Sequence, residues 1–252
     1  MFLEDINLNI AYYHDRKRIL TIDIKKKICK YVYLMLSNIL KYISNNFSNP
    51  SGIGGDISTG IMNLINQKQY KAVLKNLKLE PNNSILDIGF GNGYLLKKII
   101  RQNISVKIYG IEISKDMVQK VQLKNIHSID SGILKLDLAN INKTLLENDF
   151  FDKAYTVNTI YFWKEIEKCF SEIKRILKPN GIFINVIYTK EYLGKILFTK
   201  YDFNKYSVQE IEEMTKGNRM EIIETIEIIK NKSYCIISKK QVTCKGVRNF
   251  HR

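Results

Sequence analysis

The chain has 252 residues, of which 45% are hydrophobic, and its 40 basic and 25 acidic side chains give a net charge of +15. The length and hydrophobic content suit one soluble globular domain with an extension, and they exclude a chain too short to bury a sizeable core. The positive charge fits either a surface for nucleic acid or anionic membrane, or a composition rich in lysine, isoleucine and asparagine. Because the lysines are spread along the chain, we favour the compositional explanation.

The cysteines and histidines show no metal-binding or disulfide spacing. The four cysteines contain no C-x-x-C pair and the three histidines are scattered, so we expect neither a metal site nor a disulfide framework. Glu4 and Asp5 precede any apolar stretch, which argues against a signal peptide. The apolar run at residues 31–40 is too short to span a bilayer. We therefore expect a cytoplasmic protein.

The N-terminal part is predicted to be helical. Apolar residues recur every three or four positions between residues 28 and 43, flanked by lysines, which predicts a basic amphipathic helix. Such a helix packs on a membrane surface or, as we favour here, on its own domain as a cap. A cluster of Asn, Pro, Ser and Gly at residues 49–55 then marks a boundary. We predict a cap and glycine-rich loop at residues 1–62, an α/β domain at 63–240 that opens with a helix at 67–79, and a basic tail at 241–252.

Residues 84–96, S-I-L-D-I-G-F-G-N-G-Y-L-L, are the stretch around which the domain is organised. A short apolar strand ends at three alternating glycines, Gly89, Gly91 and Gly93, and a helix resumes at Tyr94. Strand, glycine turn and helix form the first unit of a Rossmann-like fold, in which a ligand lies beyond the carboxyl end of the strand. Asp87, two residues before the first glycine, would repel a pyrophosphate but can accept hydrogen bonds from an ammonium group.

The next two strands also end at acidic residues. Residues 106–113 form a buried-type strand with Glu112 near its end, about twenty residues past the last glycine, where such folds present a carboxylate to ribose hydroxyls. Ser114 is a suitable N-cap for a helix at 115–124. A third strand at 133–138 contains Asp137, for which turn capping is an alternative role.

The second informative stretch is residues 150–163, F-F-D-K-A-Y-T-V-N-T-I-Y-F-W. A fourth strand at 154–157 places Asn158 and the aromatic residues after it at the carboxyl edge of the sheet. For Tyr161 and Trp163 two roles stay open: they line a substrate site, since aromatic rings offer a face to a sulfonium or a planar molecule, or they pack in the core. We expect Phe162 to pack in the core.

The rest of the chain continues the α/β pattern. We predict a helix at 165–177, a turn at Lys178–Gly181, a fifth strand at 182–187, a helix capped by Ser207, and two antiparallel strands at 221–229 and 233–238. His127 precedes the third strand and is expected to be solvated.

Together these segments resemble class I S-adenosylmethionine (SAM)-dependent methyltransferases over about residues 70–240. D-x-G-x-G-x-G at Asp87–Gly93 resembles motif I of that family, residues 136–141 its third acidic segment, and L-K-P-N-G at 177–181 its L-K-P-G-G segment. The resemblance implies a Rossmann-like, seven-stranded, mostly parallel sheet flanked by helices. It implies SAM as cofactor and S-adenosylhomocysteine as product, with Asp87 and the glycine loop at the amino-acid end, Glu112 at the ribose and Asp137 at the adenine. The expected cofactor contacts are Asp87, Gly89, Phe90, Gly91, Gly93, Glu112, Ile113, Asp137, Leu138 and Asn158.

The acceptor remains open at this point. Asn158-Thr-Ile-Tyr-Phe-Trp stands where nucleic-acid amino-methyltransferases carry an N-P-P-Y type of motif, so the chain looks like the small-molecule branch. The alternatives are an RNA or protein methyltransferase that uses the +15 charge, and a SAM-binding protein without transfer activity. No histidine lies at a strand end, so we assign no catalytic base.

Overall fold

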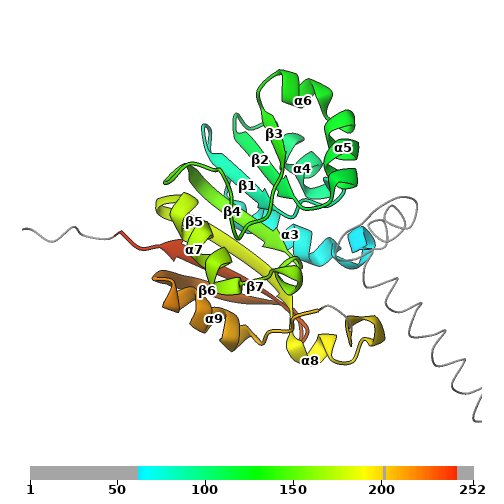
Figure 1. The fold of residues 1–252 in the computed structure, drawn as a ribbon, viewed down its shortest axis with the longest axis vertical. Coiled ribbons are helices and arrows are strands. Elements are labelled where there is room, and N and C mark those ends of the chain that lie inside the picture. Colours follow the sequence, from blue (N-terminus) through cyan, green and yellow to red (C-terminus); the bar gives the residue numbers. More distant parts are fainter. Residues whose placement is uncertain (1–61, 201–202, 243–252) are drawn as a thin grey trace, which may run out of the picture. The chain divides into compact units, whose positions relative to one another are not determined.

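The computed structural model describes residues 62–200 and 203–242 (Figure 1). The predicted helical cap up to residue 61 and the basic tail from residue 243 lie outside the described residues.

The described residues build one seven-stranded sheet, as predicted. Its strands lie in the order β3-β2-β1-β4-β5-β7-β6. Strands β1 to β5 run parallel to one another, whereas β7 is antiparallel to both of its neighbours. Their bounds are β1 Ser84–Ile88, β2 Lys107–Glu112, β3 Leu134–Leu138, β4 Phe151–Val157, β5 Leu177–Tyr188, β6 Met220–Ile229 and β7 Ser233–Lys240.

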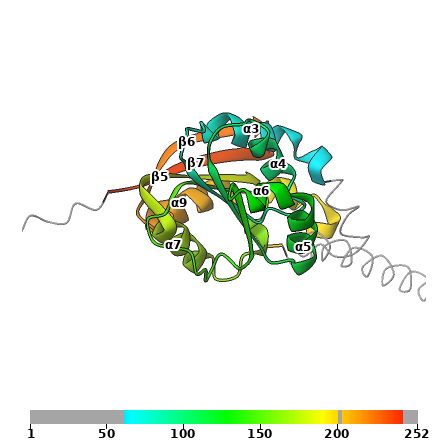
Figure 2. The ribbon, with the colours of Figure 1, turned by 90° about the horizontal axis from the view of Figure 1, so that it is seen from above.

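Helices cover both faces of this sheet (Figure 2). On one face α3 (Gln67–Leu77), α4 (Tyr94–Ile100) and α5 (Lys115–Lys124) bury an apolar cluster that includes Val73, Leu96 and Val121. On the other face α7 (Ile166–Ile176) and α9 (Val208–Gly217) pack over a second cluster that includes Phe170 and Ile211. The remaining helices are short: α6 (Ile126–Asp130), α8 (Lys190–Leu193) and two 3₁₀ turns, η1 (Ile160–Phe162) and η2 (Leu197–Lys200).

N-cap residues that are recognisable in the sequence stabilise the first turns of two of these helices. The Ser114 hydroxyl accepts a hydrogen bond from the Met117 N–H at 3.3 Å and so caps α5, as predicted. Ser207 and Glu210 form a reciprocal capping box at the start of α9.

Two segments differ from the sequence-based expectation. Residues 178–181 do not form a separate turn, because β5 begins directly after α7 and these residues are an irregularity within it. Phe151 pairs with Leu177 and Lys153 with Ile182, so four residues of β5 bulge out between the two pairs. Asn180 adopts a φ of +63° there, which accommodates the bulge. Helix α6, with the exposed His127, was not predicted because five residues give too little periodicity to recognise.

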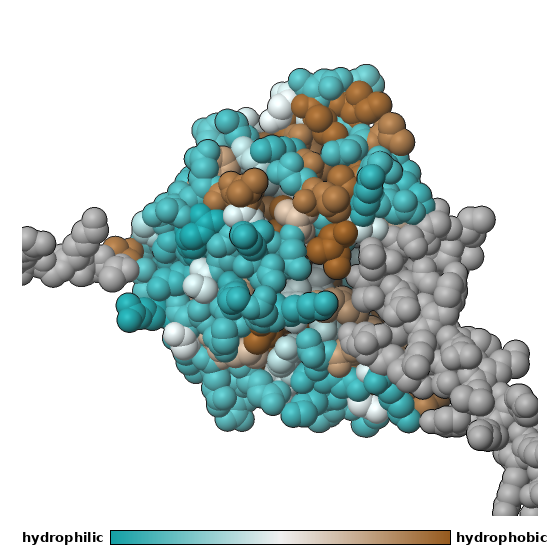
Figure 3. Space-filling view, in the orientation of Figure 1, coloured by the Kyte–Doolittle hydropathy of each residue, from teal (hydrophilic) through white to brown (hydrophobic). Residues whose placement is uncertain are grey.

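Apolar side chains gather on the surface at the β3 edge of the sheet. Figure 3 shows hydrophobic surface over α5, α6 and β3, where Leu123 is 71%, Ile126 50% and Ile133 41% exposed. The edge strand and its neighbouring helices are therefore less polar outside than the rest of the sheet surface in that view.

Candidate cofactor and acceptor site

A pocket lies at the carboxyl ends of β1, β2 and β4. It encloses about 1010 Å³ of space that protein atoms do not fill, its open mouth included. β1 pairs with β2 on one side and with β4 on the other, so the loops after these strands diverge around the pocket. Such a switch point is where open α/β sheets bind their ligands.

The glycine loop forms one wall of the pocket. Gly91 has a φ of +53°, and a Cβ added there would meet nothing within 4 Å, so its backbone faces open space that a ligand can fill. Gly89 and Phe90 also line the pocket. Gly93 does not: it is buried at the start of α4, and a Cβ there would lie 2.7 Å from Val121 Cγ1 on α5. The structure therefore gives Gly93 a packing role against α5, and its cofactor contact stays a prediction.

Asp87 is a buried carboxyl group at the floor of the pocket. Its side chain is on β1, its residue is 4% exposed, and the Tyr155 hydroxyl donates a 2.7 Å hydrogen bond to its Oδ2. Burial raises the pKa of Asp87 to about 8, the negative charge of Glu112 adds to the rise, and the hydrogen bond from Tyr155 opposes it. Among the described pocket residues no cation neutralises this carboxyl group. An ammonium group of a ligand would supply the positive charge that the described pocket residues lack.

Glu112 joins the glycine loop to the turn after β2. Its Oε2 accepts a 2.9 Å hydrogen bond from the Gly91 N–H, and its Oε1 accepts bonds from the N–H groups of Ile113 at 2.7 Å and Ser114 at 3.0 Å. A carboxylate offers about four acceptor positions, so at least one position on Oε2 remains for a ligand hydroxyl. Glu112 and Ile113 both line the pocket, as predicted from the sequence.

The adenine contact predicted for Asp137 and Leu138 is not supported by the structure. Neither residue lines the pocket: the Asp137 carboxylate forms an exposed ion pair with Lys135 at 3.7 Å, and Leu138 is 54% exposed. The lining is instead provided by the following residues, Ala139, Asn140 and Ile141. In a strand successive side chains alternate between faces, so the exact residue that turns into a site cannot be taken from an acidic segment alone.

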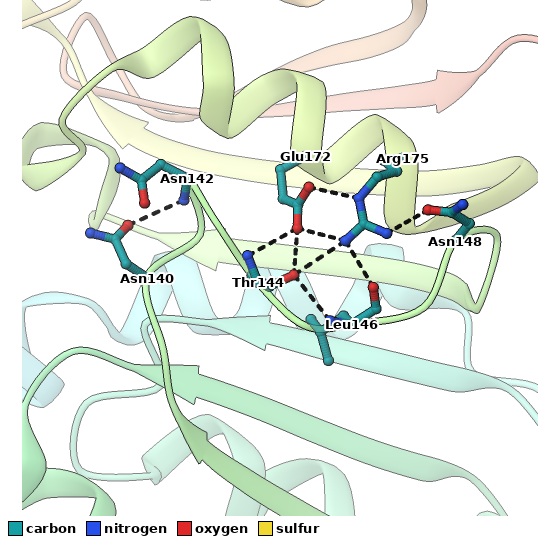
Figure 4. Close-up of polar contacts among 7 residues, drawn as sticks. All are labelled: Asn140, Asn142, Thr144, Leu146, Asn148, Glu172 and Arg175. Atoms are coloured by element: carbon teal, nitrogen blue, oxygen red, sulfur yellow. Dashed lines mark hydrogen bonds and ion pairs between the residues drawn. The ribbon is translucent and has the colours of Figure 1, made fainter.

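The segment after Asn140 is held to α7 by a polar cluster (Figure 4). The Arg175 guanidinium donates to Glu172 Oε2 at 2.7 Å and to the Leu146 carbonyl at 2.8 Å, and it also reaches Asn148. Glu172 Oε1 accepts from the Thr144 N–H at 3.1 Å. Two side chains of one helix thereby fix the loop that carries Asn140 and Ile141 to the pocket.

The loop after β4 forms the opposite wall. Asn158, at a φ of +58°, is buried, donates from Nδ2 to Asn66 Oδ1 at 3.1 Å, and accepts from the Tyr161 hydroxyl at 3.0 Å. Tyr161 is 2% exposed and points into the protein, where its hydroxyl also donates to the Tyr188 carbonyl. Trp163 lines the pocket, one of the two roles left open for it, but the partly buried Phe162 lines it in place of Tyr161. Phe162 also packs against the core cluster, as predicted, so it borders both the core and the pocket, whereas Tyr161 belongs to the core alone.

Three polar and aromatic residues of the site were missed. Asn66 and Tyr70, at the start of α3, and Tyr94, at the start of α4, all line the pocket. The Tyr70 and Tyr94 rings lie 5.1 Å apart, and Gln67 Nε2 donates to the Tyr94 hydroxyl at 3.1 Å. The position of Tyr94 directly after the third glycine was the available signal for this wall.

Metal-ligand clusters and membrane-spanning helices are both absent from the described ranges. Within residues 62–200 and 203–242 no group of three or more His, Cys, Asp or Glu side chains is placed to hold a metal ion. None of the helices in these ranges is both long and apolar enough to cross a bilayer.

Sequence comparison gives a family match over part of the chain. Residues 86–185 match the family described as "Methyltransferase domain". The uncharacterized methyltransferase YdaC of Bacillus subtilis is 29% identical over 125 residues, which are 48% of this chain and 65% of the relative. The chain spans 30% to 65% of the length of such curated relatives.

Solved structures share the fold. A chain from the complex of the Haloferax volcanii Trm112 methyltransferase activator with a methyltransferase superposes with a TM-score of 0.64 at 18% identity, covering 75% of this chain and 96% of that one. Geranyl diphosphate C-methyltransferase from Streptomyces coelicolor, solved with S-adenosyl-L-homocysteine, gives 0.60 at 12% identity, covering 69% and 79%. At these identities the likeness concerns the fold.

Proposed function

We propose that the chain is a class I, SAM-dependent methyltransferase that transfers a methyl group from SAM to a small-molecule acceptor, and the match of residues 86–185 to a methyltransferase domain family supports this. The observation that carries this proposal is the convergence of Asp87, Gly91 and Glu112 in one pocket. SAM has an ammonium group, a ribose diol and no phosphate, and the described pocket offers two carboxyl groups and an open backbone cradle.

Each part of the cofactor has a partner in this proposal. Asp87 accepts hydrogen bonds from the ammonium group, whose positive charge favours the ionised form of this buried carboxyl group. Glu112 Oε2 accepts from a ribose hydroxyl. Ile113, Ala139 and Asn140 flank the adenine, and Gly91 leaves room for the methionine part to pass close to the backbone.

The chemistry requires little from the protein beyond position. When bound, SAM supplies an electrophilic methyl group on its sulfonium, which an acceptor attacks in line. The protein then contributes orientation and exclusion of water. Phe162, Trp163 and Tyr70 give the wall an aromatic character suited to a compact, partly apolar acceptor. The structural neighbour that methylates geranyl diphosphate is in keeping with such an acceptor.

No described pocket residue is an evident general base. The lining contains no histidine, lysine or arginine among the described residues, and its carboxyl groups are those of Asp87 and Glu112, which the proposal places at the cofactor. An acceptor that presents a lone pair or an ionised atom without losing a proton to the protein fits this site best.

The proposal is tested in two steps. Calorimetric titration with SAM and S-adenosylhomocysteine should show saturable binding of both, and absence of binding would refute the cofactor site. Methyl-labelled SAM is then incubated with the protein and separate metabolite, RNA and protein fractions. Label in the metabolite fraction is the expected result, and label confined to RNA or protein would overturn the small-molecule acceptor.

A further inference from the structure

The cations of the chain are unevenly distributed between the two helical layers. Helices α3 and α4 with their C-cap residues contain seven basic side chains and no carboxylate. All seven are exposed: Lys68, Lys71, Lys75, Lys78, Lys97, Lys98 and Arg101. Within the described part of the chain, none of them forms an ion pair.

The opposite layer has a different charge pattern. Helix α9 contains three glutamates and one lysine. On α7 the cations Lys168 and Arg175 are paired with Glu165 and Glu172. If the excess of lysine were only compositional, we would expect similar numbers of unpaired lysines on both helical layers. Cations without an ion pair also occur elsewhere in the described structure, but α3 and α4 with their C-cap residues are distinguished by seven exposed ones and no carboxylate.

The lysines of α3 form a continuous line. They recur at intervals of three, four and three residues, which places them along one side of the helix, while Val73 and Leu77 on the other side are fully buried. From Lys68 to Lys78 this line extends for about 15 Å at the usual rise of an α-helix. Helices α3 and α4 begin side by side, joined by the hydrogen bond between Gln67 and Tyr94. The basic surface therefore starts at the pocket and runs away from it.

We propose that this α3–α4 face binds the phosphate backbone of a single-stranded nucleic acid. Rows of unpaired lysines and arginines release counterions from a polyanion when they bind it, which is the main source of such affinity. A half-buried aromatic side chain stands at the pocket end of the row: Lys98 Nζ lies 5.5 Å from the Tyr94 ring centre, and aromatic rings beside a basic row stack with bases.

An anionic bilayer fits the same face less well. Membrane-binding surfaces combine cations with apolar side chains that enter the lipid. Neither α3 nor α4 has a large exposed apolar side chain in the described structure. The nearest ones, Leu64 and Ile65, precede α3 at the pocket end, and the rest of the face offers only cations. A flexible polyanion can follow such a face without an apolar anchor.

The experiment compares two matched variants of the full chain. One is K71Q/K75Q/K97Q on the proposed face. The control, K164Q/K195Q/K216Q, removes the same charge from exposed lysines elsewhere that form no ion pair in the described part. Binding of fluorescent 20-nucleotide single-stranded RNA and DNA is followed by anisotropy between 50 and 300 mM salt, without SAM, so the result is independent of the proposed methyl transfer.

The expected loss follows from counterion release. Each phosphate contact contributes about 0.7 to the salt slope for single strands, so three lost contacts lower the slope by about 2 and raise Kd about 100-fold at 0.1 M salt. The control should stay within about threefold of the unmodified chain. Equal losses in both variants, or absence of binding at 0.1 M salt, would overturn the proposal. So would tighter, competing binding of phosphatidylserine vesicles through the same lysines. Unchanged thermal unfolding of both variants verifies that they fold.

Discussion

Replacing Asp87 with asparagine should make the protein more stable and at the same time unable to bind SAM well. The change is nearly isosteric, and the amide oxygen can still accept the 2.7 Å hydrogen bond from the Tyr155 hydroxyl. What it removes is a buried carboxyl group whose pKa is raised from 3.8 to about 8, chiefly by burial. In the free protein the Asp87 carboxyl group is therefore buried in surroundings that disfavour its ionised form, and a bound cation would stabilise that form.

The size of the stability gain follows from the two pKa values. Between about pH 4 and 8 the unfolded chain carries Asp87 ionised whereas the folded chain carries it protonated, so stability falls as pH rises through this window. At 1.36 kcal/mol for each unit, the loss at pH 7 is on the order of 4 kcal/mol. D87N escapes this loss, and its Tm at pH 7 should be about 10 °C higher.

Urea unfolding of both proteins from pH 4 to 8 measures this difference. The gain from D87N should be near zero at pH 4 and grow with pH, while calorimetry at pH 7 should show SAM affinity reduced about 100-fold or more, because breaking a buried ion pair costs about 3–5 kcal/mol. A stability difference that does not change with pH, or a variant that binds SAM as tightly as the unmodified chain, would refute the reasoning.

Four further predictions concern the same site. Below pH 8 Asp87 must lose its proton to bind an ammonium group, so the Kd for SAM measured by calorimetry should fall about tenfold from pH 6 to pH 7 and level off near pH 8. D87N should show no such fall, and a pH-independent Kd for the unmodified chain would contradict this prediction. G91V should abolish SAM binding in calorimetry, since its side chain enters open pocket space; it should also lower stability by about 1–3 kcal/mol while retaining a cooperative melt, because a φ of +53° strains a β-branched residue. G93A should lower stability by a similar amount in urea, because its φ of +75° is strained and its Cβ meets Val121. E112Q should weaken binding of 5′-methylthioadenosine about tenfold and leave binding of its 2′,3′-dideoxy analogue unchanged, and equal losses for both would remove Glu112 from the ribose. R175M leaves Glu172 without its partner and should lower the free energy of unfolding measured with urea by about 2 kcal/mol, a value that allows for the partial exposure of Arg175. It should reduce SAM affinity less than D87N does.

The features that local pattern determines were predicted from the sequence. The β1 strand, the glycine turn and the α4 helix are contiguous, and each has its own local signal, so Asp87 and Gly91 could be placed in a pocket in advance. Glu112 and the Ser114 cap follow from the same kind of reasoning. The match of residues 86–185 to the family described as "Methyltransferase domain" agrees with the predicted family over that part of the chain.

Features that depend on the orientation of single side chains could not be predicted. Tyr161 and Phe162 are neighbours in the η1 turn, and tertiary contacts with Asn158 and Tyr188 decide which one faces inward. Asn140, not Asp137, lines the pocket, and the loop after it is held by Arg175, thirty-five residues beyond Asn140 in the chain. Neither contact leaves a trace in local periodicity.

The position of β7 between β5 and β6 has a consequence for synthesis on the ribosome. β6 is made before β7, yet in the sheet its only described strand partner is β7, which also pairs along β5 from Tyr188 to Ile182. Until residue 240 has left the exit tunnel, β5 therefore exposes one unpaired edge and β6 has no strand to join. A nascent chain stopped within the turn at 230–232 would present both edges to other chains, and is the point at which we expect chaperone dependence to be greatest.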